Sequence, residues 1–513
     1  MDSKLDKLIY KLSNIFIMKK TILLLYILAC FISGEATAAK VIWNLKTKYD
    51  ISQSGFASII SDAKDRLKNM PNDTIIILID AGTYNIGGNG KEGILVDDIG
   101  MVNATGRIIF KGAGMDFTTL VFTDISQDMI HGSDVYGLEF KDMHCTRNRY
   151  TVTQGNVVSV GVGEIDLELH QGFPTPLDLW NNWTQGRFLR RYTTSETDPQ
   201  IIQTDNSQVP YGYVNKTYKQ PQLISERRWR FFLNNSEQVL SNYKVGDLVG
   251  VKSKFEGEIY WFQRGKNLVF ENFKWTHSSR GLVRGGFSNV YLKGCRIERA
   301  AAIQGQTPCM STPSGGPQMN QYASSGDAVS TDMVVENCFI DSPGDDCVAF
   351  FNVNGAKIIN STFRNSFARG IMVSQDAYNV CVSGTTVENS LISLEDNVAN
   401  APNLRTPFST FDINEAYKAG FITNCNLTAV PNVKKSDDNQ FAFSIFPNPT
   451  GANLNIRLSR PDNFVSVIVN LHGIVHIIST NNFSVDVSNL SKGMYLLLIT
   501  QNGQRYIKKF IKS

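Results

Sequence analysis

A short alternating pattern recurs along the middle of the chain. Each copy reads apolar, polar, apolar, then two polar residues that often include Asn or Gly, then a small residue and a second alternating pair, as in KNLVFENFKW and TDMVVENCFIDS. The equivalent positions form a column whose successive steps are 22, 43, 23, 24 and 40 residues: Phe273, Cys295, Cys338, Ser361, Thr385 and Cys425. Short strands at this period, without helical patterns between them, predict an all-β fold based on a right-handed parallel β-helix.

The same pattern extends upstream. The segments DTIIILIDAGTYNI, GRIIFKGAGMDFTTLVFTD and VYGLEFKDMHC read as first coils, and FASIISDAKDRLK before them is an amphipathic helix that could cap the open end. Aligning Met143 with Phe273 leaves a gap of 130 residues. We therefore expect an N-terminal cap and first coils over 39–145, one or two small β-barrels inserted over 146–262, and the main β-helix over 263–428.

The two ends of the chain carry different signals. MKKTILLLYILACFISGEATAAK has two lysines, an apolar run and a small-residue cleavage site, which predicts a signal peptide within residues 1–38 with Met18 as initiator. A lipobox ending at Cys30 is the alternative. No later run is apolar and long enough for a transmembrane helix, so we expect none in the mature protein. A polar linker over 429–440 precedes a predicted β-sandwich over 441–513.

The last segment contains several motifs in order. These are PNPT at 447–450, SNLSKGMYLL at 488–497 and a basic tail. Together they resemble the C-terminal sorting domain of the type IX secretion system of Bacteroidetes. The resemblance implies passage across the outer membrane to the cell surface or the medium, with the secretion machinery as a partner and loss of the sorting domain on export.

Charge and cysteine content bear on the kind of partner and on the presence of disulfides. The chain has 50 Lys and Arg against 47 Asp and Glu, which argues against a dedicated nucleic-acid surface. Export permits disulfides. However, Cys295, Cys338 and Cys425 share their column with small hydroxyl residues, so we expect them to stack inside the solenoid as free thiols.

The candidate catalytic residues lie where the strands begin. Asp345 and Asp346 stand together in SPGDDCVAFF, and Asp327 opens the strand of the preceding coil. Arg280, Asp346 and Arg369 lie 15, 15 and 16 residues before the column positions of their coils. Equivalent residues of neighbouring coils lie ~4.8 Å apart. We therefore expect the three aspartates to converge between the two arginines, although aspartates at such positions could instead cap turns.

Clustered carboxyl groups suit glycoside hydrolysis. One carboxyl must be protonated to serve as the acid, and another must be ionised to activate water or attack carbon. Further residues near these strands could bind sugar hydroxyls, or could simply belong to connections: Gln318, Asn320, Asn352 and Gln375. Trp261 and Trp275 could stack on a sugar, or pack. We expect no metal and no cofactor.

The acidic motif also resembles known families. GDDCVAF resembles glycoside hydrolase family 28, the polygalacturonases. The layout of YTVTQGNVVSV, GDLVGV and GDD over roughly residues 50 to 400 more closely resembles family 110, the inverting exo-α-1,3-galactosidases. This resemblance implies Asp327, Asp345 and Asp346 as the catalytic set acting on an α-galactoside-like or related polysaccharide. The family's usual His-Gly after the acidic pair is absent, which leaves the sugar open.

Two other classes of function remain. A polysaccharide lyase would use the carboxylates to bind Ca²⁺ and an arginine or lysine as the base, and Arg369 beside the acids fits that scheme. A surface adhesin would bind glycans without turnover, because the fold alone does not imply an activity.

Overall fold

The computed structural model divides the chain into two compact units, residues 1–428 and 429–513, which we describe separately. The structure describes residues 38–87, 93–124, 126–179, 187–202, 209–211, 213–214, 217–233, 243–252, 257–319, 328–374, 377, 379–390, 392–396, 404–407, 411–412, 423–425, 443–458, 464–470, 475–501 and 504–513. Residues 1–37, which make up all but the last residue of the predicted signal peptide, and the predicted linker over 429–440 lie outside these ranges. None of the described helices is long and apolar enough to cross a membrane.

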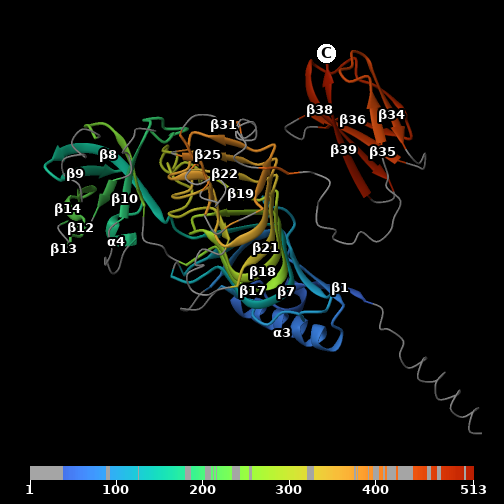
Figure 1. Cartoon of the computed structure of the whole chain (residues 1–513), viewed down its shortest axis with the longest axis horizontal. Helices are drawn as coiled ribbons and strands as arrows, with labels where there is room; N and C mark the ends of the chain where they lie inside the picture. The colour runs from blue at the N-terminus through green and yellow to red at the C-terminus, as the bar shows by residue number, and fades with distance from the viewer. Residues whose placement is uncertain are drawn as a thin grey trace, which may run out of the picture. The chain divides into compact units, whose positions relative to one another are not determined.

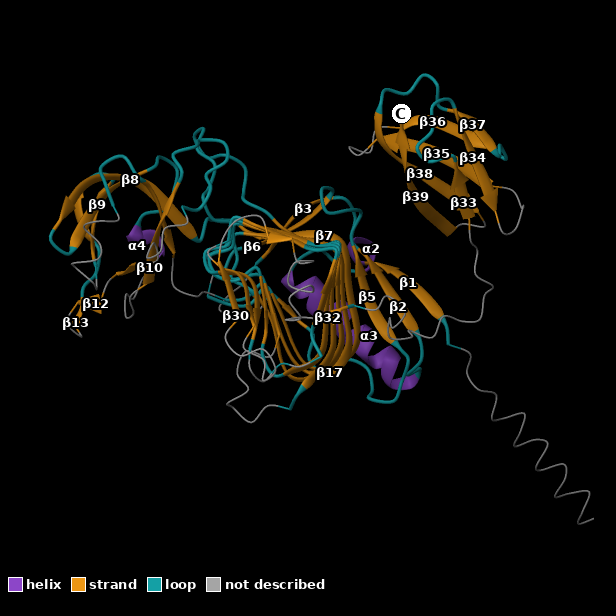
Figure 2. Ribbon diagram, turned by 45° about the horizontal axis from the view of Figure 1, so that its top comes forward, coloured by secondary structure: helices purple, strands orange, loops and turns teal. Residues whose placement is uncertain are grey.

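The first unit is built on a parallel β-helix, which confirms the predicted fold (Figures 1 and 2). Its strands pair in parallel with those one coil away, apart from two antiparallel pairs near the end. The strands are β1 (Lys40–Asn44), β2 (Thr74–Leu78), β3 (Gly82–Ile86), β4 (Ile94–Leu95), β5 (Arg107–Lys111), β6 (Thr118–Phe122), β7 (Ile130–Arg147), β17 (Tyr260–Thr276), β18 (Gly281–Lys293), β19 (Arg296–Ile297), β20 (Pro317–Met319), β21 (Ser330–Glu336), β22 (Phe339–Asp341), β23 (Val348–Phe350), β24 (Val353–Ile359), β25 (Thr362–Arg364), β26 (Arg369–Val373), β27 (Cys381–Ser383), β28 (Thr386–Glu388), β29 (Ile392–Asp396), β30 (Leu404–Pro407), β31 (Phe411–Asp412) and β32 (Thr423–Asn424).

In the coils from β7 to β27, a left-handed residue directly precedes the column position. These residues have φ between 49° and 61°, a conformation that Asn, Asp and Gly tolerate better than other residues. They are Asp142, Asn272, Gly294, Asn337, Asn360 and Gly384. The turn explains why the sequence pattern carries Asn or Gly before a small residue. It also fixes the register, so that Met143 pairs with Phe273 across the 130-residue gap.

The N-terminal coil is capped by helices. α2 (Leu45–Lys48) precedes α3 (Gln53–Asn69), where Ser52 is the N-cap and its hydroxyl accepts a hydrogen bond from the Gly55 N–H at 3.2 Å. The apolar stripe of α3, which includes Phe56 and Ile59, is buried in the solenoid core. Covering the open end in this way shields core residues that no further coil protects.

An antiparallel domain interrupts the solenoid between β7 and β17. Its seven-stranded sheet has the order β11-β10-β16-β8-β9-β15-β14 and its own apolar core, and it curves strongly (Figure 2). Among the described strands, the end members β11 and β14 do not pair. The elements are β8 (Val152–Gly161), β9 (Glu164–Leu169), α4 (Pro176–Leu179), β10 (Arg187–Tyr192), β11 (Val209–Tyr211), β12 (Tyr213–Val214), β13 (Thr217–Tyr218), β14 (Gln222–Ser225), β15 (Arg228–Phe232) and β16 (Leu248–Lys252). We call this domain the insertion.

The insertion packs against the coils that contain the acidic pair. Val152 and Leu248 of the insertion share a buried cluster with Met310 and Phe367 of the solenoid. At Gly250, a Cβ atom would lie 2.6 Å from the Cys309 sulfur, so only glycine allows this close approach.

Ion pairs strengthen the same contact. Arg299 and Arg364 each bind both Asp341 of the solenoid and Asp198 of the insertion. The solenoid and the insertion are therefore joined by apolar packing and by charge.

The second unit consists of two antiparallel sheets around one apolar core, as expected for the β-sandwich. One sheet has the order β33-β34-β37 and the other β36-β35-β38-β39. The strands are β33 (Phe443–Phe446), β34 (Asn453–Leu458), β35 (Phe464–Asn470), β36 (Val475–Thr480), β37 (Ser484–Asp486), β38 (Gly493–Gln501) and β39 (Gln504–Lys512).

The prediction for Cys425 is wrong. Cys425 forms a disulfide with Cys381, whereas Cys295 and Cys338 are buried free thiols as expected. The register also differs at this coil: Cys381 pairs with Thr423, a step of 42 residues rather than the 40 that the column assumed. Cys425 therefore does not follow Thr385 in the column.

We expect the Cys381–Cys425 disulfide to stabilise the last coils. It closes a loop with a sequence separation of 44 residues, for which the chain-entropy estimate is about 4 kcal/mol as an upper value. Reduction should therefore lower the urea midpoint of the solenoid. The double variant Cys381→Ser/Cys425→Ser should start at the lower midpoint and should not respond to reductant. Equal midpoints for the oxidised and reduced wild type would contradict a stabilising disulfide.

Candidate active site

The acidic pair lies directly before a strand, beside the first residue of the strand in the next coil. Asp345 and Asp346 precede β23, and Arg369 begins β26. The backbone fixes this juxtaposition, because the Cys347 N–H donates to the Arg369 carbonyl at 2.8 Å. Asp346 and Arg369 are therefore stacked neighbours, as the sequence predicted.

Arg280 lies one row away from its predicted position beside Asp346. Gly281 pairs with Pro317, and Gln318 pairs with Ala349, so Arg280 falls in the row of Cys347 rather than that of Asp346. The reason is that β18 advances five residues from Val283 to Ser288, whereas the coil of β23 and β24 advances four from Phe350 to Asn354, so counting back from the column does not preserve the register. Arg280 consequently contacts a different set of side chains.

Asp346 is a buried carboxyl group. It is 4% exposed, and its Oδ1 accepts hydrogen bonds from the backbone N–H of Arg369 at 3.1 Å and from its Nη1 at 3.2 Å. Burial and the neighbouring charge of Asp345 outweigh the effect of Arg369 and raise the pKa of Asp346 to about 7. This carboxyl group is thus poised to hold a proton near neutral pH, with Oδ2 left as the oxygen that would carry it.

Asp345 has a different environment. Its side chain is 27% exposed, and its Oδ2 lies 3.7 Å from Nζ of Lys252, the last residue of β16 in the insertion. At this distance the ammonium group attracts a carboxylate. The two adjacent aspartates therefore differ in both solvation and partner, which is the arrangement that separates an acid from a base.

A second polar cluster lies at the entries of β17, β18 and β20. The Arg280 guanidinium donates to Oε1 of Glu258 at 3.0 Å and to Oε1 of Gln318 at 3.0 Å, and all three residues are largely buried. Burial raises the pKa of Glu258 to about 7; Asp128 also raises it, and Arg280 acts in the opposite direction. The structure thus brings together the predicted residues Gln318 and Arg280, and it adds Glu258 to them.

Other predicted residues have varied outcomes. Asp327, Asn320 and Gln375 lie outside the described residues, so their placement stays a prediction. Asn352 follows β23 with φ 49° and is half-buried, as expected of a turn residue.

The two tryptophans have different environments. Trp275 is fully buried in the solenoid core, so the suggestion that it stacks on a sugar is wrong. Trp261 is partly buried and stacks on the His131 ring, with 4.4 Å between the ring centroids.

Sequence reasoning missed Glu258 and Lys252. Glu258 lies 22 residues before Arg280, where the strand register steps by 21, so it falls within one row of Arg280 and the repeat carried a signal. Lys252 gave no such signal, because it belongs to the insertion and reaches the solenoid only through tertiary packing.

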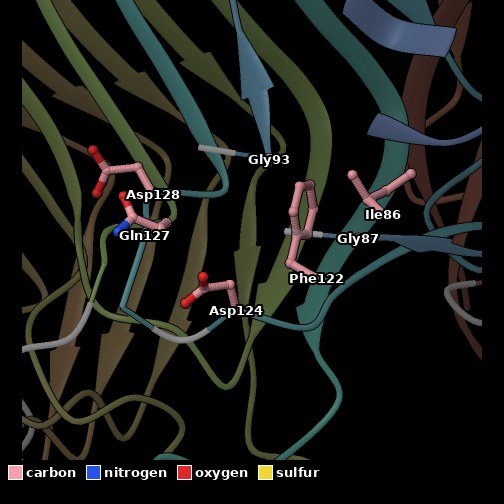
Figure 3. Close-up of a pocket in the computed structure, with 7 residues that line it drawn as sticks. All are labelled: Ile86, Gly87, Gly93, Phe122, Asp124, Gln127 and Asp128. Carbon is pink, nitrogen blue, oxygen red and sulfur yellow. The ribbon is translucent and has the colours of Figure 1, made fainter. Parts of the chain in front are cut away.

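A shallow depression lies beside the first coils and encloses no space of the size of a water molecule. Figure 3 shows Asp124, Gln127 and Asp128 near one another, with Phe122 and Ile86 farther across. None of the predicted site residues lines it. Within the described part of the chain, no three His, Cys, Asp or Glu side chains gather as a metal site would require.

Comparison with known proteins identifies the C-terminal unit. Residues 444–513 match the family model of the secretion system C-terminal sorting domain. The chain is therefore that of an exported β-helix protein, and type IX secretion delivers it to the cell surface or the extracellular space. A comparison with curated protein sequences finds no significant match.

Solved structures show only distant similarity. The catalytic unit of a GH87 α-1,3-glucanase from Streptomyces thermodiastaticus is 11% identical with a TM-score of 0.35, and the match covers 71% of this chain and 42% of that one. Pectin methylesterase PemA from Erwinia chrysanthemi is 9% identical with a TM-score of 0.25, over 73% and 86% of the two chains. TM-scores this low carry no argument about activity.

The two raised pKa values predict how stability depends on pH. Folded Asp346 and Glu258 retain protons to about pH 7, whereas in the unfolded chain they release them near their ordinary values. Their contribution is therefore fully favourable below about pH 4 and is lost as the pH rises to about 7. Asp346→Asn keeps an acceptor for Arg369 but cannot ionise. Its melting temperature should exceed that of the wild type at pH 8, and the difference should shrink towards pH 4. A difference independent of pH would contradict a raised pKa.

Proposed function

We propose that this protein is a secreted glycoside hydrolase that cleaves an α-galactoside-like or related bond by an inverting acid/base mechanism. The observation that carries the proposal is the contrast between two adjacent carboxyl groups: Asp346 is buried with a pKa raised to about 7, and Asp345 is partly exposed beside Lys252. Glycoside hydrolysis needs this division of roles. The sorting domain supports it by bringing the protein to the compartment where polysaccharides are found.

In this mechanism Asp346 is the general acid. It transfers its proton to the glycosidic oxygen as the bond from that oxygen to the anomeric carbon breaks. Water attacks the anomeric carbon from the opposite face, and a charged carboxylate accepts the proton that the water loses. Asp345 and Asp327 are the candidates for that base, and an inverting outcome requires ~6.5 to 9.5 Å between acid and base.

Substrate binding is assigned to three residues at strand entries: Arg280, Gln318 and Arg369. Three further residues are proposed to donate or accept hydrogen bonds with the sugar: Asn320, Asn352 and Gln375. Guanidinium and amide N–H groups donate to sugar oxygens in a fixed geometry. The buried hydrogen bond from Arg280 to Gln318 orients the amide, because arginine can only donate and so faces the amide oxygen.

A polysaccharide lyase is less well supported. Arg369, the candidate base, has a guanidinium nitrogen that donates to an Asp346 oxygen at 3.2 Å. A guanidinium group with a pKa above ~12 is a poor base at neutral pH. An adhesin would show binding of a glycan without turnover.

The proposal predicts that Asp345→Asn and Asp346→Asn each lower turnover by ~10² or more, because they remove proton transfer while preserving shape. Arg369→Ala should weaken binding and shift the pH optimum. The assay is release of reducing ends from a panel of algal and host glycans.

A matched control is Asp332→Asn. Asp332 is exposed, and its φ of 57° suits Asn equally well. If the folded Asp345 and Asp346 variants kept full turnover, the pair would be turn caps and the catalytic residues would lie elsewhere. Unsaturated product ends would instead indicate a lyase.

A further inference from the structure

Lys252 reaches the acidic pair from a separate part of the molecule. It ends β16, whose backbone pairs with β8 on one side and β10 on the other. Its side chain is only 5% exposed, and its ammonium nitrogen lies 3.7 Å from Oδ2 of Asp345. A lysine is rarely buried to this extent without a counter-charge. Asp345 supplies one from the solenoid.

Aromatic rings hold the ammonium group in place. It lies 5.1 Å from the ring centroid of Phe367 in the solenoid and 5.8 Å from that of Phe188 in the insertion. Cation–π attraction strengthens when the cation is shielded from water. Because Gly250, two residues earlier, permits close contact with the solenoid, the end of β16 is fixed relative to the acids.

Asp345 and Asp346 each have a different cationic neighbour. Lys252 faces Asp345 from β16, and Arg369 faces Asp346 from β26. Arg190 of the insertion lies over the Phe367 ring at 4.8 Å. If both carboxyl groups were equivalent, a shared proton would be distributed over them. Their different burial and different cations remove this equivalence.

We propose that Lys252 is a positioning residue that keeps Asp345 as the charged member of the pair, so that the proton resides on Asp346. The inference rests on the proposed function and deepens it, because it makes the insertion part of the hydrolytic site. Lys252 acts through Asp345 and need not touch the sugar.

The test is the pH dependence of kcat/KM in Lys252→Met and Lys252→Arg. Loss of the ammonium removes the positive charge beside Asp345 and makes the surroundings of the two carboxyl groups more alike. The acidic limb of the kcat/KM profile of the Met variant should therefore move to higher pH, and kcat/KM should fall on that limb by up to ~10-fold, the effect of about one pKa unit. The Arg variant retains the charge and should restore the profile. Lys252→Gln is a second neutral variant in case the Met variant does not fold.

Two controls separate this role from a structural one. Lys141→Met removes a partly buried lysine that pairs with Glu139 and Glu271 on the solenoid, and it should leave the pH profile unchanged. In an Asp345→Asn background, Lys252→Met should lower the residual kcat no further, because the group through which Lys252 acts is already neutral. Additive losses in kcat would overturn the inference.

The outcome also distinguishes this inference from the proposed function. A wild-type protein that cleaves no glycan of the panel would overturn the hydrolase proposal, and the catalytic role of Lys252 with it. A wild type that cleaves, together with a folded Lys252→Met variant whose pH profile is unchanged, would overturn the role of Lys252 alone.

Discussion

Constant register between stacked parallel strands is the constraint on which the rest of this structure depends. In the coils from β7 to β27 the chain turns at a left-handed Asn, Asp or Gly, and the column position follows at once. Once these turns are aligned, side chains at strand entries fall into rows ~4.8 Å apart. This spacing places Arg369 against Asp346 although 22 residues separate them in the chain. Chemistry at such a site therefore follows from the geometry of the repeat.

Register alone does not account for the surroundings of the acidic pair. The insertion contributes to them, because its packing on Met310 and Phe367 covers the coils that contain the pair. Burial raises the pKa of Asp346, and the covering domain also supplies Lys252. One docking contact thus places a buried lysine beside the acidic pair. The ion pairs of Asp198 and Asp341 hold that contact together.

Much of the fold could be predicted from the sequence because its signals are local. Asn or Gly before a small residue marked each turn, and the 130-residue gap between Met143 and Phe273 located the insertion. Predictions failed where coils differ in length: Arg280 was displaced by one row because β18 holds one more residue than the coil of β23 and β24, and Cys425, beyond a long excursion, left the column to pair with Cys381. Lys252 could not be predicted, since no periodicity connects an antiparallel strand of the insertion to a solenoid coil.

The most direct test of the account is a crystal structure of the Asp346→Asn variant with an uncleaved oligosaccharide bound. The proposal predicts the scissile glycosidic oxygen within hydrogen-bonding distance of the side chain at position 346, with Asp345 still beside Lys252. An oligosaccharide bound on another face of the solenoid, with no sugar oxygen near Asp345 or position 346, would contradict the claim that these strand entries form the hydrolytic site.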